Sequence, residues 1–189
     1  MKVGNTIPAP ASHVDLEHFN RVIDINLKGV VHCIRTVTRQ MATQEPLWYT
    51  PPTSRGQRYS SRSLGRGAIV NLGSVQSFIP VPATLSYTTS KHAVIGITKA
   101  AALDHTNDGI RVNAVCPGPT DTPMMQRAME RVPQMIQYIE KGIPLGGRMA
   151  SPDEVAGVIA FLCSPRASYI TGTSQIVDAG LTLCNARVI

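Results

Sequence analysis

Two short apolar runs on either side of one long helical stretch constrain most strongly how this chain folds. The runs at 68–72 and 110–115 are rich in β-branched residues and have the length of buried strands. The stretch 86–106 between them predicts a helix, which is closed by the turn Asn107-Asp108-Gly109. Because a helix that alternates with strands is typical of parallel sheets, we expect an α/β domain.

The rest of the chain predicts one domain of 189 residues with further helices around this sheet. We expect irregular structure over 1–14, and a long helix from Asp15 to about Ala42 with acidic residues in its first turn. After the second strand we expect a helical region at 122–141 interrupted by Pro133, a helix at about 152–162 and a last strand at 174–177. Ser151 and Glu154 have the spacing of a capping box for the helix at 152–162.

Positive charge is concentrated in one part of the chain, whose net charge is +6. Between Pro46 and Leu103 there is no acidic residue, and six basic residues lie there: Arg55, Arg58, Arg62, Arg66, Lys91 and Lys99. The stretch 46–66 is rich in Pro, Ser, Arg and Gly, which predicts an irregular surface insertion. Nucleic-acid binding is the alternative, but no groove-reading pattern accompanies the arginines, and we predict none.

Composition also bears on membranes, metals and cellular compartment. No apolar run approaches the ~18–20 residues that span a membrane, and no signal-peptide pattern is present, so we predict no membrane segment. The four cysteines are scattered without C-x-x-C spacing, which favours reduced thiols in a cytoplasmic protein over disulfides. The five histidines form no metal-binding pattern, so we predict no metal site.

Tyr87 and Lys91 are the residues whose spacing most suggests chemistry. On a helix over 86–106, four residues place the phenol and the ammonium on one face, one turn apart. A unit charge at ~4 Å is worth roughly 4 kcal/mol at an effective dielectric constant of ~20, so we expect Lys91 to lower the Tyr87 pKa toward neutrality, less the amount by which burial raises it. Ser74 follows the strand at 68–72, at the strand end where parallel sheets keep their sites. The alternative is a chance pair on an exposed helix.

An ordered set of motifs resembles the short-chain dehydrogenase/reductase family over about residues 12–181. The set comprises Asn26 in Asp24-Ile25-Asn26-Leu27-Lys28-Gly29, Asn71-Leu72-Gly73-Ser74, Tyr87-Thr88-Thr89-Ser90-Lys91, Arg111-Val112-Asn113, Pro117-Gly118, Gly147-Arg148, Ser151-Pro152-Asp153-Glu154-Val155-Ala156, Ile170-Thr171-Gly172 and Val177-Asp178-Ala179-Gly180. The resemblance implies hydride transfer between NADP or NAD and a small ketone or secondary alcohol. It also implies a dimer formed through the helices at 15–42 and 86–106.

The same resemblance assigns roles to individual residues. Tyr87 is implied as proton donor or acceptor, Ser74 as the group that holds the substrate oxygen, and Lys91 as the residue that lowers the tyrosine pKa and binds the nicotinamide ribose. Asn26 is implied to hold a water in a proton relay, and the nicotinamide is implied to lie against Pro117, Gly118, Thr120 and Thr122. Each has a purely structural alternative: a backbone hydrogen bond for Asn26, a turn for Pro117-Gly118, a helix cap for Thr122.

The chain departs from the family at its beginning. Family members open with a T-G-x-x-x-G-x-G turn that seats the dinucleotide pyrophosphate, and these 189 residues contain no such turn. The chain is therefore similar to the second half of a family member, with a partial Rossmann-like parallel sheet whose first strand has an unpaired edge. Two functions follow as hypotheses: an oxidoreductase, or a non-catalytic half-domain that acts as a dimerisation or regulatory partner or is an incomplete gene product.

Overall fold

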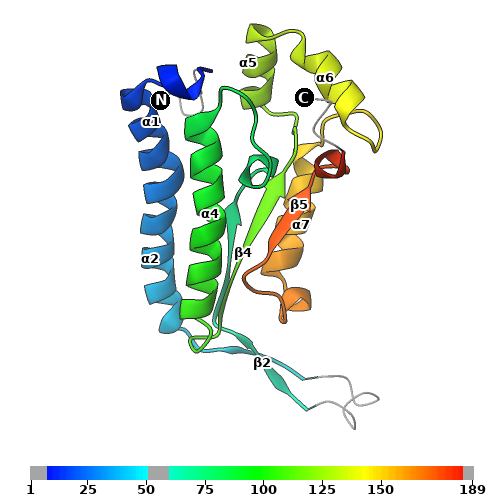
Figure 1. The fold of residues 1–189 in the computed structure, drawn as a ribbon. Helices are drawn as coiled ribbons and strands as arrows, with labels where there is room; N and C mark the ends of the chain where they lie inside the picture. Colours follow the sequence, from blue (N-terminus) through cyan, green and yellow to red (C-terminus); the bar gives the residue numbers. More distant parts are fainter. Residues whose placement is uncertain (1–7, 51–59, 185–189) are drawn as a thin grey trace.

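A three-stranded parallel sheet forms the centre of the computed structural model, which describes residues 8–50 and 60–184. Its order is β3 (Gly67–Leu72), β4 (Ile110–Pro117) and β5 (Ser174–Val177) (Figure 1). Gly67 pairs with Ile110 at one end of the first ladder, and Leu72 pairs with Val115 at the other. The predicted α/β class and parallel sheet are confirmed, and each strand begins or ends within two residues of its expected bounds.

Helices cover both faces of this sheet. On one face, Ile34 of α2 (Gly29–Ala42) and Ala101 of α4 (Leu85–Asp104) pack against Val112 of β4. On the other, Val155 and Leu162 of α7 (Pro152–Cys163) pack against Val115. Because residues alternate between faces along a strand, Val112 and Val115 serve separate cores. Two short helices, α5 (Pro123–Arg131) and α6 (Met135–Gly142), lie beyond the carboxyl ends of the strands (Figure 1).

The long helix predicted from Asp15 to Ala42 is present, but it contains one wide turn. Asp15 caps α1 (Leu16–Ile23) by accepting hydrogen bonds from the backbone of Glu17 and His18. A π-helical turn, Asp24–Lys28, then separates α1 from α2. Such turns insert one extra residue per turn and occur frequently at functional sites. Asn26 lies in this turn.

The basic insertion is not wholly irregular, so the prediction for 46–66 was wrong at its two ends. There, β1 (Leu47–Tyr49) and β2 (Arg62–Gly65) form an antiparallel ribbon that projects from the end of the sheet opposite α5 (Figure 1). The Arg62 guanidinium lies 4.6 Å from the centre of the Tyr49 ring. Composition alone did not show that Tyr49 on one strand and Arg62 on the other pair across the ribbon and stabilise it. Arg55 and Arg58 lie outside the described residues.

Three smaller findings complete the fold. Of the segment predicted to be irregular, residues 8–14 contain a short 3-10 helix, Ala11–His13, and 1–7 are outside the described residues. Within the described ranges, β3 pairs only with β4, as expected of an unpaired edge.

Over the same ranges, no helix is long and apolar enough to cross a membrane, and no three potential ligand side chains gather as a metal site would need. The expected cytoplasmic location stays a prediction.

Arg111 connects the end of α7 to the central strand. Its guanidinium donates hydrogen bonds to the carbonyl oxygens of Leu162 (2.8 Å), Ser164 (3.3 Å) and Ile170 (3.3 Å). The carbonyl groups at a helix end have no partners within the helix, and a cation there also suits the helix dipole. One side chain therefore satisfies the last turn of α7 and the loop that leads into β5.

We predict that Arg111→Ala lowers the free energy of unfolding by about 2–3 kcal/mol, because charged hydrogen bonds are lost and carbonyl groups are left without partners. Urea denaturation measures the loss. Arg166→Ala, at an exposed position just after α7, is the matched control. Equal stability of the two variants would contradict the assigned role of Arg111.

Candidate active site

Tyr87 and Lys91 lie on one face of α4, close to the carboxyl end of β3. The Lys91 ammonium nitrogen is 5.5 Å from the centre of the Tyr87 ring. The same nitrogen donates a 2.8 Å hydrogen bond to the carbonyl oxygen of Leu72, the last residue of β3. The spacing of four thus brings the two side chains together, and the strand end supplies the partner of the ammonium.

Ser74 joins them from the turn that follows β3. It caps a short 3-10 helix, η3 (Val75–Ser77), and its hydroxyl accepts the backbone N–H of Gln76 at 3.2 Å. The Ser74 side chain also forms a hydrogen bond with the Tyr87 side chain, which lowers the Tyr87 pKa. A hydroxyl, a phenol and an ammonium therefore share one place at the end of the sheet.

Burial decides the protonation of this group. Loss of solvent raises the pKa of Tyr87 by more than the Ser74 hydrogen bond lowers it. Burial is also the main influence on Lys91, and it lowers the pKa of the ammonium. The expectation that Lys91 brings the Tyr87 pKa toward neutrality was wrong for this structure. The ammonium lies over the ring and is bonded to Leu72, and loss of solvent outweighs its attraction for a phenolate.

Asn26 reaches the same helix from the π-helical turn. Its side-chain nitrogen donates to the Ser90 hydroxyl at 3.1 Å, and that hydroxyl donates to the carbonyl oxygen of Tyr87 at 2.7 Å. Asn26 therefore supports the backbone that carries Tyr87 through Ser90. Its implied role in a water relay stays a prediction.

The residues after β4 form a tight turn against the end of β5. A side chain at Gly118 would place its Cβ 3.1 Å from the Cα of Asp178, so only glycine fits without a shift. The Thr120 hydroxyl donates to Gly118 at 3.0 Å, and the Thr122 hydroxyl caps α5 by accepting the Met125 N–H at 3.3 Å. These are the structural alternatives foreseen for Pro117-Gly118 and Thr122. Contact of these residues with a nicotinamide stays a prediction.

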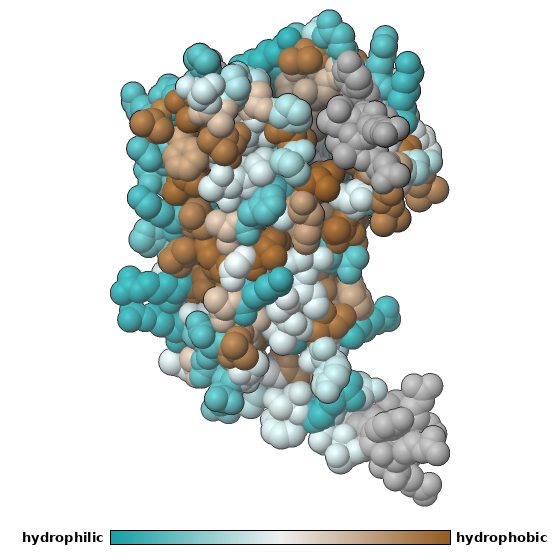
Figure 2. Space-filling view, viewed as in Figure 1, coloured by the Kyte–Doolittle hydropathy of each residue, from teal (hydrophilic) through white to brown (hydrophobic). Residues whose placement is uncertain are grey.

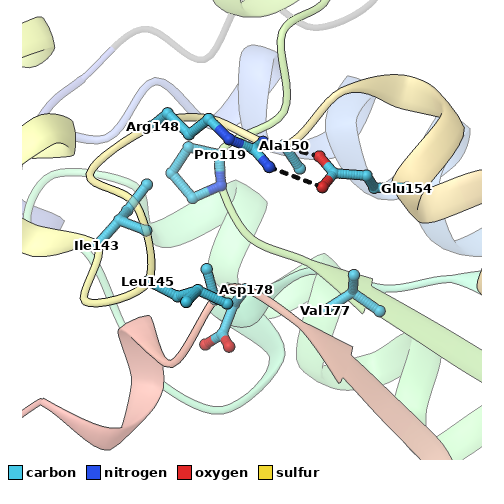
Figure 3. Close-up of a pocket in the computed structure, with 9 residues that line it drawn as sticks. Pro119, Ile143, Leu145, Arg148, Ala150, Glu154, Val177 and Asp178 are labelled. Carbon is cyan, nitrogen blue, oxygen red and sulfur yellow. Dashed lines mark hydrogen bonds and ion pairs between the residues drawn. The ribbon is translucent and has the colours of Figure 1, made fainter.

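A cavity of about 170 Å³ lies beside this turn, and sequence reasoning did not identify it. Its lining is mainly apolar (Figure 3): Pro119, Ile143, Leu145, Arg148, Ala150, Glu154, Val177, Asp178 and Ala179. Arg148 and Glu154 form two hydrogen bonds of 2.9 Å at its rim, and mainly this contact lowers the Glu154 pKa to about 2. Glu154 also accepts the Ser151 N–H at 2.8 Å, as expected of a capping box.

Two further neighbours of Ser74 also escaped the sequence analysis. Contacts with the Ser74 backbone and the Ser77 side chain lower the pKa of the buried Cys116 thiol, but burial raises it more. Ser77 and Cys116 were not recognised because a small polar residue in a turn and a thiol at a strand end are common in any α/β core. The position of Cys116 directly before Pro117 was the one available signal.

Comparison with known proteins places the chain in a family. A family model described as enoyl-(acyl carrier protein) reductase matches residues 55–182. The short-chain dehydrogenase fogB of Aspergillus ruber is 46% identical over 175 residues, which are 93% of this chain and 62% of that protein. The chain belongs to the short-chain dehydrogenase/reductase family.

Other relatives in this family have the same extent of similarity. The short-chain dehydrogenase RED2 of Pyricularia oryzae is 45% identical, over 97% of this chain and 62% of that protein. A solved gluconate 5-dehydrogenase from Burkholderia cenocepacia, in complex with NADP and tartrate, is 28% identical with a TM-score of 0.79, over 97% of this chain and 64% of that one. The chain thus spans less than two thirds of the length of these relatives.

Proposed function

We propose that this chain carries the substrate-activating part of an NAD(P)-dependent oxidoreductase that interconverts a ketone and a secondary alcohol. The hydrogen-bonded pair Ser74–Tyr87, with the Lys91 ammonium over the phenol ring, is the observation that supports it. Short-chain dehydrogenase relatives add to this support.

The protonation of Tyr87 fits the reduction of a carbonyl group. Because burial raises its pKa, the phenol keeps its proton at neutral pH and acts as a general acid toward a carbonyl oxygen. The Ser74 hydroxyl, which already interacts with Tyr87, holds that carbonyl oxygen in place by a hydrogen bond. Ser90, supported by Asn26, fixes the backbone of the tyrosine and so its direction. Proton transfer from Tyr87 to the oxygen then completes the alcohol.

The residues present fit the nicotinamide side of a dinucleotide. The donor set that would hold it consists of the Tyr87 hydroxyl, the Lys91 ammonium and the Thr120 and Thr122 hydroxyls next to Pro117-Gly118. The bound nicotinamide supplies or accepts the hydride. For the adenosine and pyrophosphate side, the 189 residues offer no Gly-rich turn, so we expect weak dinucleotide binding by this chain alone. Either NADP or NAD suits this set, and the substrate is a small carbonyl compound or alcohol.

A non-catalytic partner role is the second candidate function. The observation that favours it is the edge of β3, which has no strand beside it within the described residues and ends at the half-exposed Leu72. A sheet edge of this kind pairs readily with another chain. Activity that depends on Tyr87 distinguishes the two functions.

We predict that Tyr87→Phe lowers the rate of ketone reduction by about 10²–10⁴-fold, since it removes the general acid but keeps the ring. The assay follows NADPH or NADH oxidation with a panel of small ketones, at millimolar dinucleotide. Tyr169→Phe is the matched control, because Tyr169 is fully exposed in the segment that follows α7. The oxidoreductase proposal fails if the purified chain has no activity, or if the two substitutions lower the rate equally.

We also propose that the chain self-associates through the helices at 15–42 and 86–106, here α1, α2 and α4. Apolar side chains are exposed on these helices (Figure 2): Leu16, Ile25, Val31, Val37, Leu85 and Leu103. On α4, Leu85 and Leu103 lie on the exposed stripe that also contains Gly96, around which a side chain would meet no atom within 4 Å. Burial of this stripe between two copies would remove it from water.

We predict that Gly96→Arg converts the dimer to a monomer, because it places a charge in the centre of the proposed interface without a clash inside the chain. Light scattering coupled to size exclusion measures the mass. Gly157→Arg on α7 is the control, since that glycine is equally open and also helical. A dimer that survives Gly96→Arg, or one that only Gly157→Arg dissociates, would place the interface elsewhere.

A further inference from the structure

Ser77 connects the turn that carries Ser74 to the helix that carries Lys91. It is the last residue of η3, and only 5% of it is exposed. Its hydroxyl donates a 2.7 Å hydrogen bond to the backbone carbonyl oxygen of Lys91. The Ser77 hydroxyl oxygen in turn accepts the backbone N–H of Ser74 at 3.3 Å. One side chain thus joins the backbones of two residues of the candidate site.

The space around Ser77 leaves the turn little freedom to adjust. A Cβ at Gly73 would lie 2.6 Å from the Cys116 sulfur and 3.2 Å from the Ser77 hydroxyl oxygen. The Gly73 N–H is fixed to the carbonyl oxygen of Val115 at 2.8 Å. Burial keeps the Cys116 thiol protonated, so this tightly packed floor beneath Ser74 is uncharged. The turn therefore has a rigid base on β4 and one short connection to Lys91.

A second connection holds the other end of the turn. The Gln76 side-chain oxygen accepts the hydroxyls of Thr84 (2.9 Å) and Thr88 (3.0 Å) at the start of α4. These contacts lie before and beside Tyr87 in the helix, and the Ser77 contact lies one turn after it. Of these two connections, the one through Ser77 bonds directly to the Ser74 backbone N–H.

We propose that Ser77 is a positioning residue, which holds Ser74 beside Tyr87 by fixing the Ser74 backbone to the backbone of Lys91. This inference rests on the proposed function, in which Ser74 and Tyr87 act on one substrate oxygen. Ser77 itself touches no reacting atom in this scheme. Its removal leaves every proposed catalytic group in the chain and changes only their relative placement.

Titration of the Tyr87 phenol tests this without cofactor or substrate. The chain is labelled with ¹³C at the tyrosine ring carbon that bears the hydroxyl, and the Tyr87 resonance is assigned by its loss in Tyr87→Phe. The Ser74 hydrogen bond lowers the Tyr87 pKa, so Ser74→Ala raises it. We expect Ser77→Ala to raise it as well, and the double variant to show no further rise beyond Ser74→Ala, because the two residues act through one contact.

Thr38→Val is the matched control for Ser77→Ala. The buried Thr38 hydroxyl also donates to a backbone carbonyl, that of Ile34 at 2.8 Å, but within α2 and away from the site. It should lower stability without a change in the Tyr87 titration. If Ser77→Ala does not fold, Ser77→Cys is used in its place, because cysteine keeps a side chain of similar size with a weaker hydrogen-bond donor.

Two results would overturn the positioning role. One is an unchanged Tyr87 titration in the folded Ser77 variant, whatever Ser74→Ala does. The other is additive shifts in the double variant, which would mean that Ser77 acts on Tyr87 independently of Ser74. A chain without reductase activity would refute the proposed function and leave this titration readable, so the two failures are distinguishable.

Discussion

The withdrawal of Tyr87 and Lys91 from water is the interaction on which the candidate site depends. Burial alone favours the neutral form of each group, and it moves the two pKa values in opposite directions, upward for the phenol and downward for the ammonium. A partly buried ammonium needs a hydrogen-bond partner, and the Leu72 carbonyl oxygen provides one. The end of β3 therefore does more than deliver Ser74, because it also holds the charge beside the phenol.

The rest of the fold keeps these groups in place. Three separate connections converge on the first turns of α4: Asn26 through Ser90, Gln76 through two threonines, and Ser77 directly. Each connects α4 to a different segment of the chain through hydrogen bonds that are at least partly buried, where such bonds are costly to break. The arrangement of the candidate site is thus preformed in this chain, whereas the edge of β3 has no neighbouring strand within the described residues.

Patterns that are local in sequence predicted the elements well. The β-branched runs gave β3 and β4, the Ser151–Glu154 spacing gave the start of α7, and the spacing of Tyr87 and Lys91 gave their common face. Packing between distant segments was not readable in this way. The π-helical turn at Asn26, the ribbon of β1 and β2 and the Ser77 contact all depend on partners that the local pattern does not contain. The direction of the Tyr87 pKa shift differed from the expectation for the same reason: the spacing showed the neighbouring cation, but the depth of burial that opposes it depends on the whole fold.

The ionisation of Tyr87 in the unmodified, cofactor-free chain tests the central claim most directly. Ultraviolet titration of the chain minus that of Tyr87→Phe isolates this one phenol, with N-acetyltyrosine amide in the same buffer as reference. We predict a midpoint above that of the reference, whose ordinary value is 10.0, because burial outweighs the hydrogen bond from Ser74. A midpoint at or below the reference would show that Lys91, and not loss of solvent, controls the proton of Tyr87.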